Sequence, residues 1–500
     1  MVDATHGAPP GPRRPRPWLA ALLSFVFPGL GQAYAGQHRV AVLLAVPVLL
    51  LIAGVTAAVN GVGDLRNGLL SSTFLVAVVA TNVALFGWRT FAIAHAGLAP
   101  PSIEPRERRI GLTTVAILVV AAIGMHAWIG VVVGQLDDTL SQVFGRATVD
   151  GAPEPIPPAK GGAPEESVEP ISAPQYRWDG TERINILLLG TDAHPSREAV
   201  LTDVVLVVSI DPVAGRAAMI SVPRDTGFLP MPDESLFIGG VFPDKVNELP
   251  LHASLNPATW CPDLADDPTG CGLRTIERSV GLYLGLQIHH YAMVDMAGFA
   301  ELIDALGGVR LCLPGELHDP EFDGSLSNAG RDEPLVLPAG CHEYDGLDAL
   351  AYARSRKGWI EMPDGTRVDQ SDFSRNERQQ KLLLALRNEL AEADLFFELP
   401  AVLRAIGRSV STDVPRDQAG DLASLLPLIT GPDIERVVLG YPDFVDAPAQ
   451  PDLNYLLVPR RDAIREEMAR LFGADALVGW YLGTTASSPS APDASDAQAP

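Results

Sequence analysis

Apolar residues are distributed differently in the two parts of the chain. The first 134 residues contain long apolar runs, whereas the remainder alternates short apolar runs with polar segments. Three runs, at about residues 40–59, 70–94 and 110–134, are nearly free of charged side chains. Because about 20 residues of helix cross a bilayer, each run is long enough to span a membrane. A further run over residues 18–36 is broken by Pro28-Gly29-Leu30-Gly31, so we expect a re-entrant or interfacial segment there.

The arginine residues near these runs predict an orientation. Three arginines lie within residues 13–16, and three more lie within residues 106–109, just before the last run. Basic residues close to a span stay in the cytoplasm. Three spans satisfy both clusters, whereas four spans would place one cluster on the wrong side. We therefore expect a cytoplasmic N-terminus over residues 1–17, a multi-pass membrane region over residues 18–134, and everything that follows outside the cell.

The part beyond the membrane region begins and ends with segments of low complexity. Residues 135–182 are rich in Pro, Gly and Glu, which is typical of an extended, solvated linker. Residues 486–500 are mostly Ser, Ala, Pro and Asp, which predicts a disordered tail. We expect the folded outer part to lie between these two segments.

Strand and helix patterns alternate in that outer part. The runs Ile184 to Leu189 and Val204 to Ile210 are β-branched and apolar, which predicts buried strands, and Arg375 to Leu390 has helical apolar spacing. This alternation predicts a three-layer α/β domain, over residues 183–395, with a mixed or mainly parallel sheet. We expect residues 396–485 to form a C-terminal α/β extension packed on it.

Charge divides the chain in the same way as hydropathy. The net charge is −24, yet the first 134 residues carry nine Arg and no Lys against four acidic residues, which leaves +5 there and −29 in the remainder. An acidic chain is a poor partner for polyphosphates such as nucleic acid, so we expect no nucleic-acid binding.

The four cysteines, Cys261, Cys271, Cys312 and Cys341, all fall in the outer part. An even number of cysteines in an extracellular domain predicts two disulfides. Of the three possible connectivities we favour the local one, which pairs the first two and the last two. A metal site is the alternative, but no two cysteines are spaced as C-x-x-C.

Arginine and aspartate residues gather where predicted strands end and loops begin. Guanidinium groups bind phosphate or diphosphate through two parallel hydrogen bonds. Carboxylates beside a diphosphate require a hard cation between them, so this combination predicts Mg²⁺ or Mn²⁺. Each motif alone is also typical of an exposed ion pair. The residues concerned are Asp192, Asp203, Arg224, Asp225, Arg354, Arg356, Asp372, Arg375, Arg378 and Gln379.

Taken together, the motifs in this part of the chain are more specific than any one of them. They occur in one order: Leu187 to Asp192, Thr202-Asp203, Ser221 to Thr226, Lys245 to Asn247, Gly298 to Val309, Gly346 to Arg356 and Asp372 to Gln380. This series resembles the LytR-CpsA-Psr family of bacterial cell-envelope proteins over roughly residues 183–395.

The resemblance implies a membrane-anchored phosphotransferase with an extracellular α/β/α sandwich. Such proteins move a glycopolymer from a polyprenyl-diphosphate carrier in the membrane lipid to peptidoglycan. By motif, Asp192 and Asp203 match the acidic positions near the metal. Arg224, Arg354, Arg356, Arg375 and Gln379 match the diphosphate-binding positions.

The catalytic group that the resemblance implies consists of Arg224 with Asp203 and Asp225. Either aspartate could accept the proton of the acceptor hydroxyl, and the sequence does not choose between them. The chain departs from the family at Leu201, where Arg is usual, although Arg197 lies four residues earlier. Two other functions therefore stay open: hydrolysis of a polyprenyl diphosphate by water, and a catalytically silent receptor or scaffold for the lipid-linked polymer.

Overall fold

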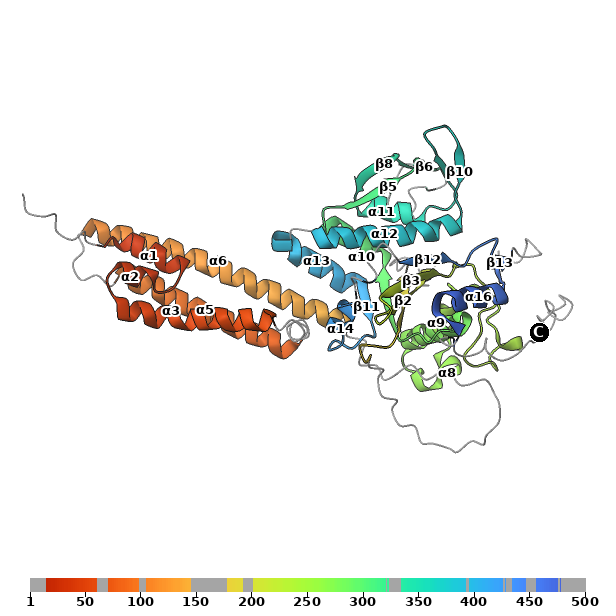
Figure 1. Ribbon diagram of the computed structural model, residues 1–500, viewed down its shortest axis with the longest axis horizontal. Helices are drawn as coiled ribbons and strands as arrows, with labels where there is room; N and C mark the ends of the chain where they lie inside the picture. The colour runs from red at the N-terminus through yellow and green to blue at the C-terminus, as the bar shows by residue number, and fades with distance from the viewer. Residues whose placement is uncertain are drawn as a thin grey trace, which may run out of the picture. The chain divides into compact units, whose positions relative to one another are not determined.

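The chain forms two compact units, residues Met1–Leu140 and Ser141–Pro500, which are treated separately below. A computed structural model describes residues 15–60, 71–98, 105–144, 178–191, 201–320, 322, 334–392, 395–425, 428, 434–446, 456–474 and 477. Figure 1 labels the helices and strands within these ranges.

The first unit is helical. Its helices are α1 (Pro17–Val26), α2 (Leu30–Tyr34), α3 (His38–Asn60), α5 (Ser72–Leu98) and α6 (Pro105–Val143). Three stretches are long and apolar enough to cross a membrane, namely His38–Thr56, Ser72–Leu98 and Pro105–Val143. The three predicted spans therefore coincide with three apolar helices. Their leucine and valine side chains are largely exposed within the unit, as expected for a lipid-facing surface.

The short helices α1 and α2 occupy the predicted re-entrant segment. Their connection turns at Gly29, whose φ of +103° favours glycine. A Cβ at Gly31 would lie 2.0 Å from the Ala20 carbonyl oxygen, so only glycine allows the two helices to approach this closely. The Ser24 hydroxyl donates to Gln32 Oε1 (3.0 Å), and Gln32 Nε2 donates to the Ala92 carbonyl of α5 (2.8 Å). These polar contacts hold the turn against α5.

The predicted linker is shorter in the structure than in the sequence-based expectation. Helix α6 continues through Val143, so residues 135–143 are helical and not extended. At the other end, the backbone N–H of Trp178 donates to Gln418 Oε1 (3.4 Å), and its indole N–H donates to the Glu182 carbonyl. The rest of the linker and the predicted tail lie outside the described residues.

A mixed six-stranded sheet forms the centre of the second unit, with the order β11-β4-β1-β2-β3-β12. The pairs β1–β4 and β3–β12 are parallel, and the other three are antiparallel, so the sheet is mixed rather than mainly parallel. Its strands are β1 (Ile184–Thr191), β2 (Thr202–Asp211), β3 (Arg216–Ser221), β4 (His290–Asp295), β11 (Val410–Thr412) and β12 (Glu435–Val438).

Helices cover both faces of this sheet. On one face, Leu187 and Leu189 of β1 pack with α9 (Pro268–Leu284) and α16 (Arg461–Phe472). The alternate side chains, such as Ile184, face α12 (Asp372–Glu392) and α14 (Ala419–Ala423) on the other side. This alternation follows from the period of two residues in a strand. The predicted three-layer α/β/α arrangement is therefore present (Figure 1).

A second apolar core lies on the far side of α12. Leu382 and Leu386 of α12 join this core, whereas Leu383 and Leu384 face the central sheet, so α12 is shared between the two. The other members are α10 (Met296–Ala305), α11 (Gly346–Arg354), α13 (Leu395–Ser409), β5 (Val309–Leu313), β6 (Glu316–Asp319), β7 (Leu335–Leu337), β8 (Gly340–Tyr344) and β9 (Trp359–Glu361). The exposed strand β10 (Arg367–Asp369) pairs with β9.

The C-terminal segment is part of the central domain, and not an extension on its surface. Strands β11 and β12 form the two edges of the central sheet, and α16 contributes Ile464 and Met468 to its core. The boundary expected at residue 395 therefore does not separate two packing units. The remaining elements are β13 (Val445–Asp446), β14 (Val458–Pro459), α7 (Leu249–Leu255), α8 (Pro257–Trp260), and the 3₁₀ turns η1 (Ile238–Gly240) and η2 (Pro262–Leu264).

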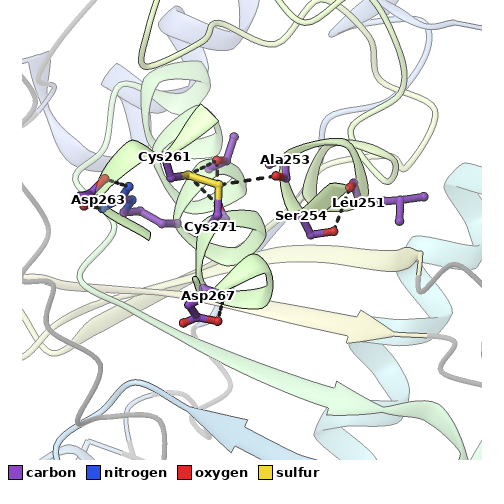
Figure 2. Close-up of a disulfide and its surroundings, with 10 residues drawn as sticks. Leu251, Ala253, Ser254, Cys261, Asp263, Asp267 and Cys271 are labelled. Atoms are coloured by element: carbon purple, nitrogen blue, oxygen red, sulfur yellow. Dashed lines mark hydrogen bonds and ion pairs between the residues drawn. A yellow bond between two sulfur atoms is a disulfide. The ribbon is translucent and has the colours of Figure 1, made fainter. Parts of the chain in front are cut away.

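Both cysteine pairs are the predicted local ones, Cys261–Cys271 and Cys312–Cys341. The second pair joins residues directly opposite each other in the β5–β8 ladder. Figure 2 shows the first pair between α8 and α9, with Ala253 of α7 beside it. Arg274 of α9 forms an ion pair with Asp263 across the same turn.

We expect removal of either disulfide to destabilise the outer domain. Chain-entropy arguments give about 2.7 kcal/mol for a loop of 10 residues and about 3.6 kcal/mol for one of 29 residues. Replacing both cysteines of a pair by Ser should therefore lower the free energy of unfolding by these amounts, with the larger loss at Cys312–Cys341. Chemical denaturation of the purified variants would check the order, and an unchanged midpoint for both would contradict it.

His289 makes the folded domain sensitive to acid. Its Nδ1 accepts a hydrogen bond from the backbone N–H of Asn185 (2.9 Å), so the ring is held in its neutral form. Burial, together with the neighbouring His290, lowers the pKa of His289 to about 4. The unfolded chain, with an ordinary histidine pKa of about 6.5, binds a proton that the folded chain excludes. Stability that is present above pH 6.5 is thus lost as the pH falls towards 4.

We expect protonation linked to His289 to lower the free energy of unfolding by about 2 kcal/mol between pH 7.5 and pH 5. His289→Asn should flatten that part of the dependence, whatever its effect on stability at pH 7.5. His342→Asn, at an exposed histidine, is the matched control and should leave the dependence unchanged. Unfolding free energies measured at several pH values would check this. The prediction would be refuted if the unfolding free energies of the wild type and His289→Asn changed with pH in the same way.

Candidate active site

The sheet topology brings the predicted acidic and basic residues to one edge. Thr191 at the end of β1 pairs with Thr202 at the start of β2, and Asp295 ends the parallel strand β4 beside it. Ser221 at the end of β3 pairs with Leu206 of β2. The ends of β1, β3 and β4 and the start of β2 therefore meet at one end of the central strands, here called the site edge.

Arg224 forms the centre of a charged cluster at the site edge. Its Nη1 lies 2.8 Å from Asp203 Oδ1, and its Nε lies 3.8 Å from Asp225 Oδ1. Lys245 Nζ lies 2.9 Å from the same Asp225 oxygen. The side chains of Arg224 and Asp203 are 19% and 16% exposed, so the cluster is largely shielded yet open to a ligand. Two cations and two carboxylates thus alternate within one small volume.

Backbone hydrogen bonds hold the three segments of this cluster together. The N–H of Val246 donates to the Thr226 carbonyl (2.8 Å), and the N–H of Asn247 donates to the Arg224 carbonyl (3.4 Å). The Asn247 carbonyl in turn accepts from the backbone N–H of Thr202 (3.4 Å). The segment that carries Lys245 is therefore pinned between those that carry Asp203 and Asp225.

Helix α12 begins at the same edge. Gln380 Nε2 donates to the Ser221 hydroxyl at the end of β3 (2.9 Å). The ring of Phe373 closely approaches Gly440, just after β12, where a Cβ would lie 2.5 Å from it. Arg375 lies in the first turns of α12 and is only 3% exposed. Its charge and the positive end of the helix both favour an anion at this edge.

Arg378 connects α12 to the loop that carries Arg356. Its Nε donates to the Tyr352 carbonyl (2.8 Å), and its Nη groups donate to the Ser355 carbonyl and to Gln370 Oε1. Burial lowers the pKa of Arg378 to about 10, which leaves it charged at neutral pH. Arg378 is therefore a structural residue that ties the end of α11 to α12.

The buried carboxylate of Asp319 holds the loop that carries Arg356. Asp319 is 2% exposed, and its Oδ2 accepts from the Ser355 hydroxyl (2.7 Å) and from the backbone N–H groups of Arg356 (3.2 Å) and Lys357 (3.3 Å). Glycine is required at position 358, where a Cβ would lie 1.8 Å from the His318 carbonyl oxygen. The backbone at Arg356 is therefore well defined.

Two other predicted diphosphate ligands lie where α11 ends. Arg354 is the last residue of α11 and is partly buried. Gln379 Nε2 donates to the Ala353 carbonyl near the end of α11 (3.3 Å). One of its two amide hydrogens is therefore already in a hydrogen bond within the protein. Arg224 follows the end of β3 at the site edge, and Arg375 lies in α12, whose Gln380 contacts Ser221 there.

Of the two predicted metal ligands, Asp203 lies in the described part of the chain. Asp192 lies outside the described residues, as does Arg197. Asp203 Oδ1 forms an ion pair with Arg224, and Asp225 Oδ1 forms an ion pair with Lys245. Carboxylate oxygens are the donors that Mg²⁺ prefers, and each aspartate has a second oxygen, so the donor set fits such an ion. Leu201 lies directly before β2 and is partly buried.

The sequence analysis gave no role to two residues, Lys245 and Asp319, that the structure places at or beside the site. Lys245 belonged to a recognised motif but was given no role, although its ammonium lies on Asp225. Arg378, which the sequence analysis grouped with the possible phosphate ligands, donates to the Tyr352 and Ser355 carbonyls. Asp319 had no signal in the sequence, because its partners are distant along the chain.

Comparison with known proteins shows which family the chain belongs to. The family model described as the LytR_cpsA_psr family matches residues 159–441. A polyisoprenyl-teichoic acid–peptidoglycan teichoic acid transferase, TagU, of Halalkalibacterium halodurans is 29% identical over 240 residues, which cover 48% of this chain and 64% of that protein. The cell wall biosynthesis protein LcpA of Corynebacterium glutamicum is 26% identical over 318 residues, or 63% of this chain and 55% of that protein.

Solved structures are also similar to part of this chain. The structure described as TagT bound to LIIa-WTA is 21% identical and covers 60% of this chain and 94% of that chain, with a TM-score of 0.40. A LytR-Csp2A-Psr enzyme from Actinomyces oris is 21% identical and covers 58% of this chain and 90% of that chain, with a TM-score of 0.37. The chain spans less than two thirds of the length of the two curated relatives named above.

Proposed function

Because this chain belongs to the LytR_cpsA_psr family, we propose that it is a phosphotransferase of the cell envelope. It would move a glycopolymer from a polyprenyl-diphosphate carrier to peptidoglycan. The names of two relatives support this proposal, since one is a teichoic acid transferase acting on peptidoglycan and the other a cell wall biosynthesis protein.

One observation in this chain carries the proposal: Arg224 lies between Asp203 and Asp225, with Lys245 on the second aspartate. Phosphoryl transfer is accelerated mainly by positioning and by neutralising charge on the transferred group. Cations held by backbone hydrogen bonds and buried ion pairs do not have to reorganise when the substrate arrives. The buried Arg375 and the N-terminus of α12 would add positive potential at the same edge.

The proposed reaction is an attack by an acceptor hydroxyl on the diphosphate bound at this edge. The acceptor hydroxyl oxygen attacks the phosphorus attached to the glycopolymer, a new P–O bond forms, and the bond to the polyprenyl phosphate breaks. Arg224 and Arg375 would stabilise the negative charge on the leaving phosphate. Asp203 or Asp225 would take the hydroxyl proton, and comparing Asp203→Asn with Asp225→Asn would identify which.

We also propose a divalent cation, Mg²⁺ or Mn²⁺, as cofactor, held by Asp192 and Asp203. When bound, it would supply a hard positive charge against the diphosphate oxygens. Arg354, Arg356 and Gln379 would bind and orient the rest of the diphosphate. Chelation by EDTA should abolish turnover, and adding Mg²⁺ should restore it.

The membrane region fits a substrate that stays in the bilayer. The three apolar helices anchor the chain, with the family domain C-terminal to them. We propose three spans, a cytoplasmic N-terminus and an extracellular catalytic domain, because this places both arginine clusters inside the cell. Cysteine-accessibility labelling at the two ends of α6 would test this orientation.

The test of function is turnover of a glycan carried on a short polyprenyl diphosphate by the full-length protein in detergent with Mg²⁺. A transferase would release polyprenyl phosphate and join the polymer to added peptidoglycan fragments. Release with no peptidoglycan product would identify a hydrolase. Saturable binding without any release would identify a receptor or scaffold, a function that Leu201 in place of the usual Arg keeps open.

A further inference from the structure

A second group of ligand atoms lies close to the site edge but outside it. One atom each from Asp244, Glu248 and His252 lies within 4.8 Å of the other two. His252 Nε2 is 4.0 Å from Glu248 Oε2. In the described part of the chain, this is the one group of three or more His, Cys, Asp or Glu side chains that could hold a metal ion. All three residues are partly buried.

The backbone presents these side chains on one side. Glu248 and His252 are four residues apart, and the N–H of His252 donates to the Glu248 carbonyl (3.0 Å), so they follow one another along a helical turn. The ring of His252 packs edge-on against Phe242, with centroids 5.4 Å apart, and Phe242 is almost completely buried. This packing restricts the imidazole, while its Nε2 faces Glu248.

The charges in this group are unbalanced. Within the described ranges, neither Asp244 nor Glu248 forms an ion pair with a lysine or arginine. Lys245, the nearest cation along the chain, has its ammonium on Asp225. In the described part of the chain, an imidazole nitrogen is therefore the only ionic neighbour of these two converging carboxylates. An ordinary acidic surface cluster lacks the nitrogen donor that this group contains.

We propose that Asp244, Glu248 and His252 bind a divalent transition-metal ion, of which Zn²⁺ is the best fit. Zinc takes histidine nitrogen together with Asp or Glu oxygen, commonly with three protein ligands and an open fourth position. Purely oxygen-liganded Mg²⁺ is a poorer match for a group that contains imidazole. This site is separate from Asp203, Asp225 and Arg224.

The location of the site suggests what the bound ion does. Asp244 precedes Lys245, and Glu248 and His252 follow Asn247, so the ion closes a short loop around the segment that is pinned to Thr226 and Arg224. Cross-linking both ends of this segment fixes the position of Lys245 beside Asp225. This consequence for Lys245 rests on the function proposed above, whereas metal binding itself does not.

Zinc binding by the full-length protein in detergent tests the proposal directly. Metal-free protein is titrated with Zn²⁺ by calorimetry, and its melting temperature is measured with and without Zn²⁺. We expect saturable binding and a higher melting temperature with the ion. His252→Gln and Glu248→Gln should each weaken Zn²⁺ binding by at least about tenfold, and each should remove the rise in melting temperature.

Two matched variants make the result specific. His318→Gln removes a histidine that also faces a carboxylate, with Nε2 2.8 Å from Glu316 Oε1, but that belongs to no three-residue group in the described structure. Asp203→Asn removes a ligand of the proposed catalytic metal. Both should keep the Zn²⁺ site. Equal Zn²⁺ affinity in the wild type, His252→Gln and Glu248→Gln would overturn the proposal. Loss of turnover in any variant would not bear on it.

Discussion

Replacing Arg224 by Ala is expected to abolish turnover of a polyprenyl diphosphate, with a loss of at least about 10³-fold in kcat/KM. Arg224 lies between Asp203 and Asp225, so its removal both withdraws a positive charge from the leaving phosphate and leaves two carboxylates facing the anionic substrate. Release of polyprenyl phosphate, measured at saturating Mg²⁺, is the appropriate assay. Arg375→Ala should have a similar effect, since its buried charge lies in the first turns of α12.

The sheet itself provides a matched control for Arg224. Arg183 and Asp211 form an ion pair at the opposite end of β1 and β2, at 2.7 Å and with both side chains 20% exposed. The pair Arg224–Asp203 has almost the same geometry and exposure. Arg183→Ala should therefore remove a similar ion pair and retain turnover. Wild-type turnover in both Arg224→Ala and Arg375→Ala would refute the assignment of the site.

Replacing Arg378 by Ala is expected to cost about 3 kcal/mol or more in the free energy of unfolding. Arg378 is 3% exposed, and its guanidinium donates to the Tyr352 and Ser355 carbonyls and to Gln370. Truncation leaves these buried acceptors without their donor and opens a cavity at the contact between α11 and α12. Chemical denaturation measures the loss.

Two further variants separate this effect from simple changes to α12. Lys381→Ala replaces an exposed residue of the same helix and should change the free energy of unfolding by less than about 0.5 kcal/mol. Arg378→Lys keeps the charge but cannot reach both carbonyls at once, so it should be nearly as destabilising as Ala. Equal stability of Arg378→Lys and the wild type would show that charge alone matters there.

Much of the fold follows from local patterns. The three apolar helices, the buried strands β1 and β2 and the helix α12 were each predicted from a run of residues whose periodicity is a property of neighbours in the chain. The same is true of the Cys261–Cys271 pair, whose two residues are only 10 apart. Where the structure differed, as at α6, a helix continued into a segment whose first residues still had helical character.

The assembly of the sheet could not be predicted in this way. Strands β11 and β12 are short, and each is recognised as a sheet edge only by its partner, which lies more than 100 residues earlier in the chain. The sequence placed these residues in an extension because nothing local distinguishes an edge strand from a surface strand. The antiparallel pairing of β1 with β2 likewise depends on register across the sheet.

By itself, the sequence determined which residue types can carry the chemistry and the order in which they occur, because motifs are local. It identified Asp203, Arg224, Asp225 and Arg375 without showing that they could meet. Only the tertiary structure decided that Arg224 lies between the two aspartates, that Lys245 joins them, and that Arg378 is a structural residue. The physical reason is that ion pairs and buried hydrogen bonds form between segments far apart in the chain, and their geometry depends on strand register and helix packing.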